Sequence, residues 1–318
     1  MRDHGGNIDW AMAHYGGDGW IDLSTGINRV PYPVPALPPE AWTGLPTRAA
    51  VARLTEAARA AYGTEAAILP VAGAQAAIQM IPRLGQPGRA RVLGPTYNEH
   101  AASLAAAGWA VREVGDPASL VGADLAVVVN PNNPDGRTHA TADLMALAGR
   151  VGRLIVDESF ADPRPDLSLA PHTGASGLFV LRSFGKFYGL AGLRLGFVLG
   201  HADDIAALAD MAGPWPVSGA AIEIGAQALA DQAWSGATTA RLRREAARAD
   251  ALANAAGWQP VGGADLFRLY DTPDAQAAQE RLAHHQIWSR VFPYSPRWLR
   301  LGLPGESHEW ARLAAALS

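Results

Sequence analysis

The stretch that decides the fold is Ser183-Phe184-Gly185-Lys186, followed by Leu190-Ala191-Gly192-Leu193-Arg194-Leu195-Gly196-Phe197. Lys186 is the only lysine in the 318-residue chain, and every other strongly basic side chain is an arginine. A lysine can lose its proton when it is desolvated and can then attack a carbonyl, whereas an arginine cannot. One retained lysine, with Ser183 three residues before it and Arg194 eight residues after it, therefore indicates a chemical role.

The chemistry that this lysine favours is a Schiff base with pyridoxal 5′-phosphate. The alternative is a surface lysine that survived in an arginine-biased sequence. The motifs upstream of Lys186 favour the first interpretation.

Two of these motifs follow buried strands. Residues 153–157 are an apolar run that ends in Asp157, which could pair with a protonated pyridine nitrogen. The run 125–129 leads into the turn Asn130–Gly136, where Asn133 could donate to the phenolic oxygen of the cofactor. Taken alone, Asp157 could equally be a helix N-cap or a metal ligand, and the second motif could be only a turn.

Two further motifs lie closer to the N-terminus. The run 67–71 leads into Gly73-Ala74-Gln75, a turn and helix start whose N–H groups suit a phosphate. After the strand 90–94, Tyr97 could stack on a pyridine ring and His100 could support Asp157. Each of these could instead be an ordinary helix-start residue.

The pattern of the whole chain predicts an α/β fold. Strands alternate with helices from residue 66 to about 212, which indicates a mostly parallel, doubly wound sheet with ligands at its C-terminal edge. The last sixty residues predict a smaller α+β domain. We expect an irregular N-terminal arm at 1–45 that contributes to the substrate site, a large domain at 46–215, and linking helices with a small domain at 216–318. The strands expected in the sheet are 67–71, 90–94, 125–129, 153–157, 178–182 and 194–199.

The order of these motifs resembles the fold-type-I pyridoxal-phosphate enzymes of the class I and II aminotransferase superfamily, in the histidinol-phosphate aminotransferase-like branch. The resemblance covers nearly the whole chain. It implies that Lys186 and Asp157 are catalytic and that Tyr97 stacks on the cofactor. The residues implied to bind the cofactor are Ala74, Gln75, Tyr97, Asn133, Asp157, Ser183, Lys186 and Arg194.

Two departures from the family pattern are visible. The family carries a tyrosine three residues after the strand-end aspartate, where this chain has Phe160. It also tends to carry a tyrosine that reaches the phosphate bound to the partner subunit, where this chain has Leu45. The first departure removes a hydrogen bond to the phenolic oxygen, and the second puts the contact with the partner's phosphate in doubt.

The N-terminus distinguishes between branches of the superfamily. His4-Gly5-Gly6-Asn7, followed by Asp22–Asn28 and a proline-rich stretch, resembles the L-threonine-O-3-phosphate decarboxylases of cobalamin biosynthesis. The resemblance implies decarboxylation of L-threonine O-3-phosphate to (R)-1-amino-2-propanol O-2-phosphate. The implied substrate residues are His4, Gly5, Asn28, Asn133, Arg290 and Arg300. The alternatives are a disordered terminus for the first motif and a solvated strand-edge arginine for Arg290.

Rival functions remain open at this point. An aminotransferase acting on histidinol phosphate or a related substrate would share every cofactor residue. A non-catalytic binding protein and an interaction subunit of the cobalamin pathway, recruited by a synthetase, are the other two. An intact Lys186 and Asp157 argue against the non-catalytic alternative.

Composition excludes several classes of protein. The net charge is −4 and no basic patch is visible, which argues against nucleic-acid binding. Without cysteine the chain can form neither disulfides nor thiolate metal sites, and we expect no metal. With no signal peptide and no apolar stretch of about 18 residues, we expect a cytoplasmic protein, and the family resemblance implies a homodimer.

Overall fold

The computed structural model describes residues 4–318, and their contacts divide the chain into two compact units. The larger unit contains residues 32–133 and 138–234, and the smaller contains residues 4–31, 134–137 and 235–318. The predicted domain boundaries after residues 45 and 215 stay predictions, because a compact unit need not be a functional domain. Residues 1–3 of the predicted arm lie outside the described residues.

The larger unit is built on a sheet with the strand order β2-β8-β7-β6-β5-β3-β4. Strands β3 to β7 run parallel, and β8 runs antiparallel to both of its neighbours. The predicted α/β class is therefore confirmed. The strands are β2 (Ala67–Val71), β3 (Arg89–Leu93), β4 (Ala110–Val114), β5 (Leu125–Val129), β6 (Leu154–Asp157), β7 (Leu178–Ser183) and β8 (Gly196–Gly200).

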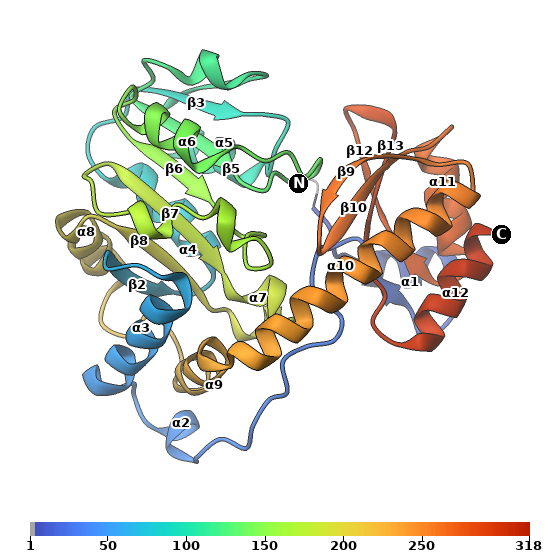
Figure 1. The fold of residues 1–318 in the computed structure, drawn as a ribbon, viewed down its shortest axis with the longest axis horizontal. Coiled ribbons are helices and arrows are strands. Elements are labelled where there is room, and N and C mark those ends of the chain that lie inside the picture. The colour runs from blue at the N-terminus through green and yellow to red at the C-terminus, as the bar shows by residue number, and fades with distance from the viewer. Residues whose placement is uncertain (1–3) are drawn as a thin grey trace. The chain divides into compact units, whose positions relative to one another are not determined.

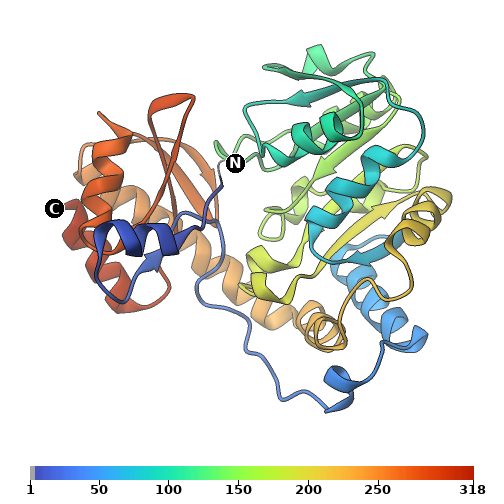
Figure 2. The ribbon, with the colours of Figure 1, turned by 180° about the vertical axis from the view of Figure 1, so that it is seen from behind.

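Helices cover both faces of this sheet. Figure 1 shows α6 in front of it, and the reverse view in Figure 2 brings α4 and α5 to the front. The central strands β5 and β6 are buried along their whole length, as strands covered on both faces must be. The helices are α2 (Glu40–Thr43), α3 (Arg48–Tyr62), α4 (Ala74–Met80), α5 (Glu99–Ala106), α6 (Thr141–Ala148), α7 (Phe184–Phe187), α8 (Ala202–Ala212) and α9 (Gly219–Ala230).

Two edge strands differ from the sequence prediction. β2 was expected inside a parallel sheet but lies at its edge, antiparallel to β8. β4 was not predicted, because its sequence Ala-Val-Arg-Glu-Val has no apolar run. Arg112 and Glu113 are exposed there, as charged side chains on an edge strand commonly are.

The smaller unit contains an antiparallel sheet with the order β12-β13-β10-β9, flanked by helices. A separate short pair joins β1 to β11 in parallel, so residues 21–22 are tied to residues 287–288. The strands are β1 (Ile21–Asp22), β9 (Gln259–Ala264), β10 (Phe267–Asp271), β11 (Ile287–Trp288), β12 (Arg290–Phe292) and β13 (Ser295–Gly302). The helices are α1 (Ile8–Tyr15), α10 (Gln232–Ala255), α11 (Ala275–Ala283) and α12 (Ser307–Leu317).

The predicted irregular arm at 1–45 is wrong in part, because residues 8–15 form the helix α1. Ile8, Ala11 and Tyr15 have helical spacing and pack in a small apolar cluster with Ala283 and Trp288. The surrounding glycines concealed this short helix. Strand β9 was also missed, because Pro260, Gly262 and Gly263 are residues that strands disfavour.

Over residues 4–318, none of the helices combines the length and the apolar character needed to cross a membrane.

Candidate active site

One cavity of about 150 Å³ in the larger unit collects the chemically active side chains. It lies where β6 and β7 end and where α4 and α7 begin. All eight residues predicted to bind a cofactor line it, although they come from six separate segments of the chain. They are Ala74, Gln75, Tyr97, Asn133, Asp157, Ser183, Lys186 and Arg194.

Asp157 lies at the end of β6 and is 2% exposed. Its Oδ2 is 2.8 Å from Nε2 of His100, and its Oδ1 accepts hydrogen bonds from the backbone N–H and the hydroxyl of Ser159. Burial would raise the pKa of Asp157, but the bonds from His100 and Ser159 outweigh it and hold the pKa below its usual range. Asp157 is therefore a carboxylate that stays ionised inside the cavity, supported by His100 as expected.

Lys186 lies in α7, the short helix that follows β7 directly. Its Nζ is 5.7 Å from the ring centre of Phe160, which also lines the cavity. Aromatic side chains pack against this helix. The ring of Tyr188 stacks on that of Phe184, with ring centres 4.3 Å apart, and on that of Trp234, with ring centres 5.5 Å apart. The lysine is thus carried on a short helix packed against aromatic side chains, and its amine lies near an apolar ring.

The start of α4 forms a cradle for an anion. Gly73 has a φ of 77°, which favours glycine, and a Cβ at this position would lie 2.6 Å from Nη2 of Arg194. The guanidinium of Arg194 therefore sits directly against the turn that exposes the first N–H groups of the helix. Ser183 adds a hydroxyl to the same cavity. Backbone donors, a hydroxyl and a guanidinium together suit a phosphate group.

Gln75 and Tyr97 are linked by a chain of hydrogen bonds. The hydroxyl of Tyr97 donates to Oε1 of Gln75 at 3.3 Å, and Nε2 of Gln75 donates to Oε2 of Glu99 at 3.0 Å. Glu99 is 7% exposed. Sequence reasoning gave Glu99 no role, although it lies within the motif that contains Tyr97 and His100.

These observations test whether pyridoxal 5′-phosphate fits the cavity. The cavity contains three features that the cofactor needs. The turn at Gly73, with Ser183 and Arg194, can bind an anion. The buried carboxylate of Asp157 can pair with a ring nitrogen, and Lys186 provides a single amine. Phosphate, pyridine and aldehyde are the three groups that such residues would recognise. The residues fit the cofactor.

The predicted substrate residues, apart from Asn133, belong to the smaller unit. Arg290 on β12 and Arg300 on β13 are directly opposite each other in the antiparallel pair. Arg300 is 4% exposed, and its Nη2 donates to the backbone oxygen of Ser24 at 2.6 Å. The guanidinium of Arg290 lies 5.2 Å from the ring centre of Phe292, and that of Arg300 lies 5.3 Å from the ring centre of Phe267.

The N-terminal motif meets this arginine pair through Ser24. The backbone N–H of Gly6 donates to Oγ of Ser24 at 2.6 Å, and Nε1 of Trp288 donates to the oxygen of Gly6 at 2.9 Å. A Cβ on Gly5 would lie 2.4 Å from the oxygen of Ser24, so only glycine allows this approach. His4 is exposed beside this anchored segment.

Asn28 is 3% exposed and is oriented through its oxygen. Oδ1 accepts hydrogen bonds from Nη2 of Arg241 at 2.7 Å and from the N–H of Val30 at 3.0 Å. These contacts identify the oxygen end of the amide. Ser24 and Arg241 were not predicted. Ser24 lies inside the quoted motif, but nothing in the sequence links Arg241 to Asn28.

The family model for class I and II aminotransferases matches residues 40–317. The chain belongs to the class I and II aminotransferase family. Among proteins of this family, a threonine-phosphate decarboxylase from a Sinorhizobium species is 46% identical over 99% of this chain and 97% of its own. The threonine-phosphate decarboxylase of Pseudomonas aeruginosa is 44% identical over 100% of this chain and 97% of its own.

The fold also agrees with that of a solved structure. The structure of histidinol-phosphate aminotransferase from Sinorhizobium meliloti, in complex with pyridoxal 5′-phosphate, superposes with a TM-score of 0.82. The two chains are 22% identical, and the match covers 98% of this chain and 93% of that chain. At this identity the similarity concerns the fold.

Proposed function

We propose that this protein is a pyridoxal-phosphate-dependent enzyme that decarboxylates L-threonine O-3-phosphate to (R)-1-amino-2-propanol O-2-phosphate, a step of cobalamin biosynthesis. The observation that carries the proposal is the identity of 44–46% over nearly the full length of two threonine-phosphate decarboxylases. The intact cavity with its single lysine supports it.

Each wall of the cavity would hold one part of the cofactor. Asp157 would pair with the ring nitrogen, Asn133 with the phenolic oxygen, and Tyr97 would lie against the ring. The phosphate would be held by Ala74, Gln75, Ser183 and Arg194. When bound, pyridoxal 5′-phosphate supplies an electron sink for the electron pair of the bond that breaks at the substrate's α-carbon.

The substrate carries a carboxylate and a phosphate, and the smaller unit offers donors for both. Arg300 would bind the carboxylate, and Arg290 would bind the second anion. The imidazole of His4, the N–H of Gly5 and the amide of Asn28 would add donors.

The residues of this chain then decide which bond breaks. Holding the carboxylate and the phosphate at two fixed places orients the α-carbon, so that the bond to the carboxylate is the one aligned for cleavage. Lys186 would deliver the proton that replaces the carboxylate at the α-carbon. The contacts with His100 and Ser159 keep Asp157 ionised. Its carboxylate would therefore stabilise a protonated ring nitrogen of the cofactor.

One experiment separates decarboxylation from transamination. Purified holoenzyme is incubated with L-threonine O-3-phosphate, and released carbon dioxide is measured beside glutamate formed in the presence of 2-oxoglutarate. We expect stoichiometric carbon dioxide without added 2-oxoglutarate. Glutamate formation that depends on 2-oxoglutarate, without carbon dioxide, would instead identify an aminotransferase such as one for histidinol phosphate.

The assembly and compartment belong to the same proposal. We expect a homodimer in the cytoplasm, as is usual for enzymes of this fold class. Recruitment by a synthetase of the cobalamin pathway also stays a prediction. Size-exclusion chromatography with light scattering tests the dimer, and a pull-down with the synthetase tests the second interaction.

A further inference from the structure

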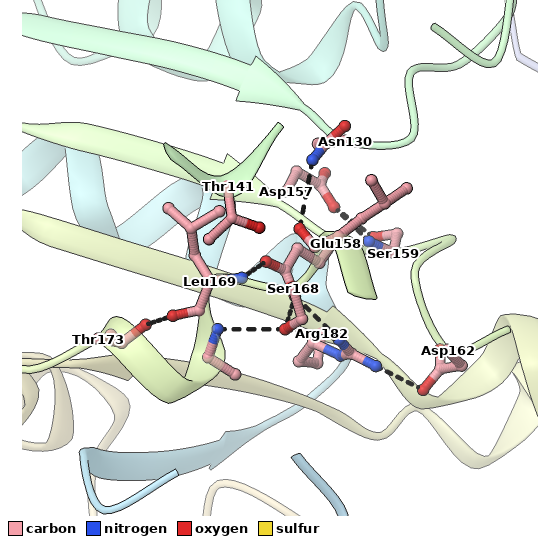
Figure 3. Close-up of polar contacts among 12 residues, drawn as sticks. Asn130, Thr141, Asp157, Glu158, Ser159, Asp162, Ser168, Leu169, Thr173 and Arg182 are labelled. Carbon is pink, nitrogen blue, oxygen red and sulfur yellow. Dashed lines mark hydrogen bonds and ion pairs between the residues drawn. The ribbon is translucent and has the colours of Figure 1, made fainter. Parts of the chain in front are cut away.

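A buried ion-pair network surrounds Arg182, immediately before Ser183. Nη1 of Arg182 donates to Oε2 of Glu158 at 2.9 Å, and Nη2 donates to Oδ1 of Asp162 at 2.8 Å. Figure 3 shows the guanidinium between the two carboxylates. The side chains are 5%, 0% and 8% exposed, respectively. None of the three lines the cavity described above.

Glu158 and Arg182 are each adjacent in sequence to residues that do line the cavity. Successive side chains in a strand point to opposite faces, so Asp157 faces the cavity while Glu158 faces away from it. The same holds for Ser183 and Arg182 at the end of β7. The N–H of Glu158 still donates to the oxygen of Leu181 at 2.9 Å, so the two strand ends stay paired at this point.

Arg182 therefore contacts both cavity-forming segments, 158–162 and 183–186, on the side away from the cavity. Its contacts with the two carboxylates lie at the two ends of the segment 158–162, and between them Ser159 and Phe160 line the cavity. The backbone of Arg182 continues into Ser183, and Lys186 follows three residues later. One guanidinium thus couples the segment that carries Asp157 and Phe160 to the segment that carries Ser183 and Lys186.

We propose that Arg182, through Glu158 and Asp162, is a positioning residue that sets the spacing between the Asp157 side and the Lys186 side of the cofactor cavity. This inference rests on the proposed cofactor but not on the identity of the substrate. Its consequence is that the affinity for pyridoxal 5′-phosphate, and the environment of the bound cofactor, depend on a side chain that does not touch the cofactor.

Stabilisation of the fold alone does not account well for this network, because burying its charged groups costs free energy. Burial raises the pKa of Glu158 in spite of the nearby Arg182 charge, although the carboxylate also accepts from Oγ of Ser168 and the N–H of Leu169, each at 2.6 Å. Among the described residues, Nε of Arg182 and Oδ2 of Asp162 have no hydrogen-bond partner. Buried ion pairs often stabilise a fold no better than apolar side chains would, so a positioning role accounts better for this one.

The variant Arg182→Lys tests the proposal, because lysine keeps the charge but has no planar fork to bridge two carboxylates. The matched control is Arg268→Lys in the smaller unit, where Nε and Nη2 of Arg268 bind both oxygens of Asp250 at 2.9 and 2.8 Å. Apo-protein is titrated with pyridoxal 5′-phosphate, the absorbance of the bound cofactor is followed against pH, and thermal unfolding is recorded.

We expect Arg182→Lys to weaken pyridoxal-phosphate binding about tenfold and to shift the pH titration of the cofactor absorbance, since small displacements in a site are costly. Arg268→Lys should lower the unfolding temperature and leave both cofactor readouts unchanged. Equal cofactor affinity and equal titration in wild type and Arg182→Lys would overturn the proposal. A wild-type protein that fails to bind the cofactor would instead overturn the proposed function.

A second pair of variants covers the case in which Arg182→Lys does not fold. Asp162→Ala removes one contact and leaves the pair with Glu158, whereas Asp162→Asn keeps an oxygen that Arg182 can donate to. We expect Asp162→Ala to weaken cofactor binding and Asp162→Asn to restore most of it. Equal affinities for these two variants and the wild type would also overturn the proposal.

Discussion

His100 and Asp157 form a buried pair, with Nε2 of the imidazole 2.8 Å from Oδ2 of the carboxylate and both side chains almost fully covered. His100 lies in the first turn of α5, and Asp157 ends β6. The contact therefore joins a helix to the strand that carries the acid. It is also one of the two causes that keep the pKa of Asp157 low against the effect of burial.

Replacing His100 with leucine should make the free energy of unfolding of the apo-protein depend less strongly on pH in the acid range. With its pKa depressed in the folded state, Asp157 contributes stability that is complete above its unfolded value of about 3.9 and is lost as the pH falls through the folded pKa. The variant loses the part of that depression that His100 causes and keeps the part due to Ser159. We expect it to be less stable by about 1.5–3 kcal/mol at neutral pH, the usual value of a hydrogen bond to a charged group.

Urea unfolding of both apo-proteins between pH 3 and pH 7 measures this difference. It should shrink as the pH falls below about 4, where protonation removes the advantage from the wild type. His100→Asn, which keeps a donor, serves as the control and should recover part of the loss. A difference that is the same at every pH would show that His100 does not act through the charge on Asp157.

Lys186 can be tested cleanly because the chain has no other lysine. Borohydride reduction of the holoenzyme should attach a pyridoxyl group at Lys186, with the N-terminal amine as the one other reactive amine. Peptide mass spectrometry locates the label. Lys186→Arg keeps the positive charge but cannot form the Schiff base, so it should lose both the label and the visible absorbance band. An unchanged visible absorbance band in this variant would remove the assignment of Lys186 as the residue that binds the cofactor.

Phe160→Tyr should lower the pKa of the cofactor's visible absorbance band. Phe160 is 5% exposed and its ring centre lies 5.7 Å from Nζ of Lys186, so a hydroxyl added here enters the cavity. A hydrogen bond from that hydroxyl to the cofactor's phenolate favours the charged form. Spectral titration gives the pKa, and Phe160→Leu, which adds no hydroxyl, should not lower it. An unchanged or higher value for Phe160→Tyr would mean that the hydroxyl does not reach the phenolic oxygen.

The sequence predicts the cavity better than it predicts the elements around it. Asp157 and Ser183 end buried strands, and such ends meet at one edge of a parallel sheet, so their convergence follows from the pattern alone. The edge strand β4 and the helix α1 escaped prediction because charged residues or flanking glycines interrupt their apolar spacing.

Side-chain contacts between residues far apart in the sequence could not be predicted either. Arg182 meets Glu158 across 24 positions, and Arg241 meets Asn28 across 213. Neither pair has a local pattern, because the partners become neighbours only when the sheet and the smaller unit form. Ser24 is intermediate: it lies in a motif that the sequence singles out, but its link to Arg300 depends on the fold.

The N-terminal segment provides the last prediction, because the choice of decarboxylase over aminotransferase began there. A Cβ on Gly5 would lie 2.4 Å from the backbone oxygen of Ser24, and Ser24 accepts from Gly6 and from Arg300. Gly5→Ala should therefore displace His4 and disturb the arginine that is proposed to bind the carboxylate. We expect kcat/KM for L-threonine O-3-phosphate to fall about ten- to a hundredfold, and His4→Ala to show a similar loss.

Neither variant should change the affinity for pyridoxal 5′-phosphate, because the cofactor residues all belong to the larger unit. Gly236→Ala is the matched control, since a Cβ at that position in α10 meets nothing within 4 Å and should leave kcat/KM unchanged. Steady-state kinetics and cofactor titration on the same preparations separate the two effects. Full activity of Gly5→Ala and His4→Ala on L-threonine O-3-phosphate would remove the N-terminal segment from the substrate site, and the aminotransferase alternative would then gain weight.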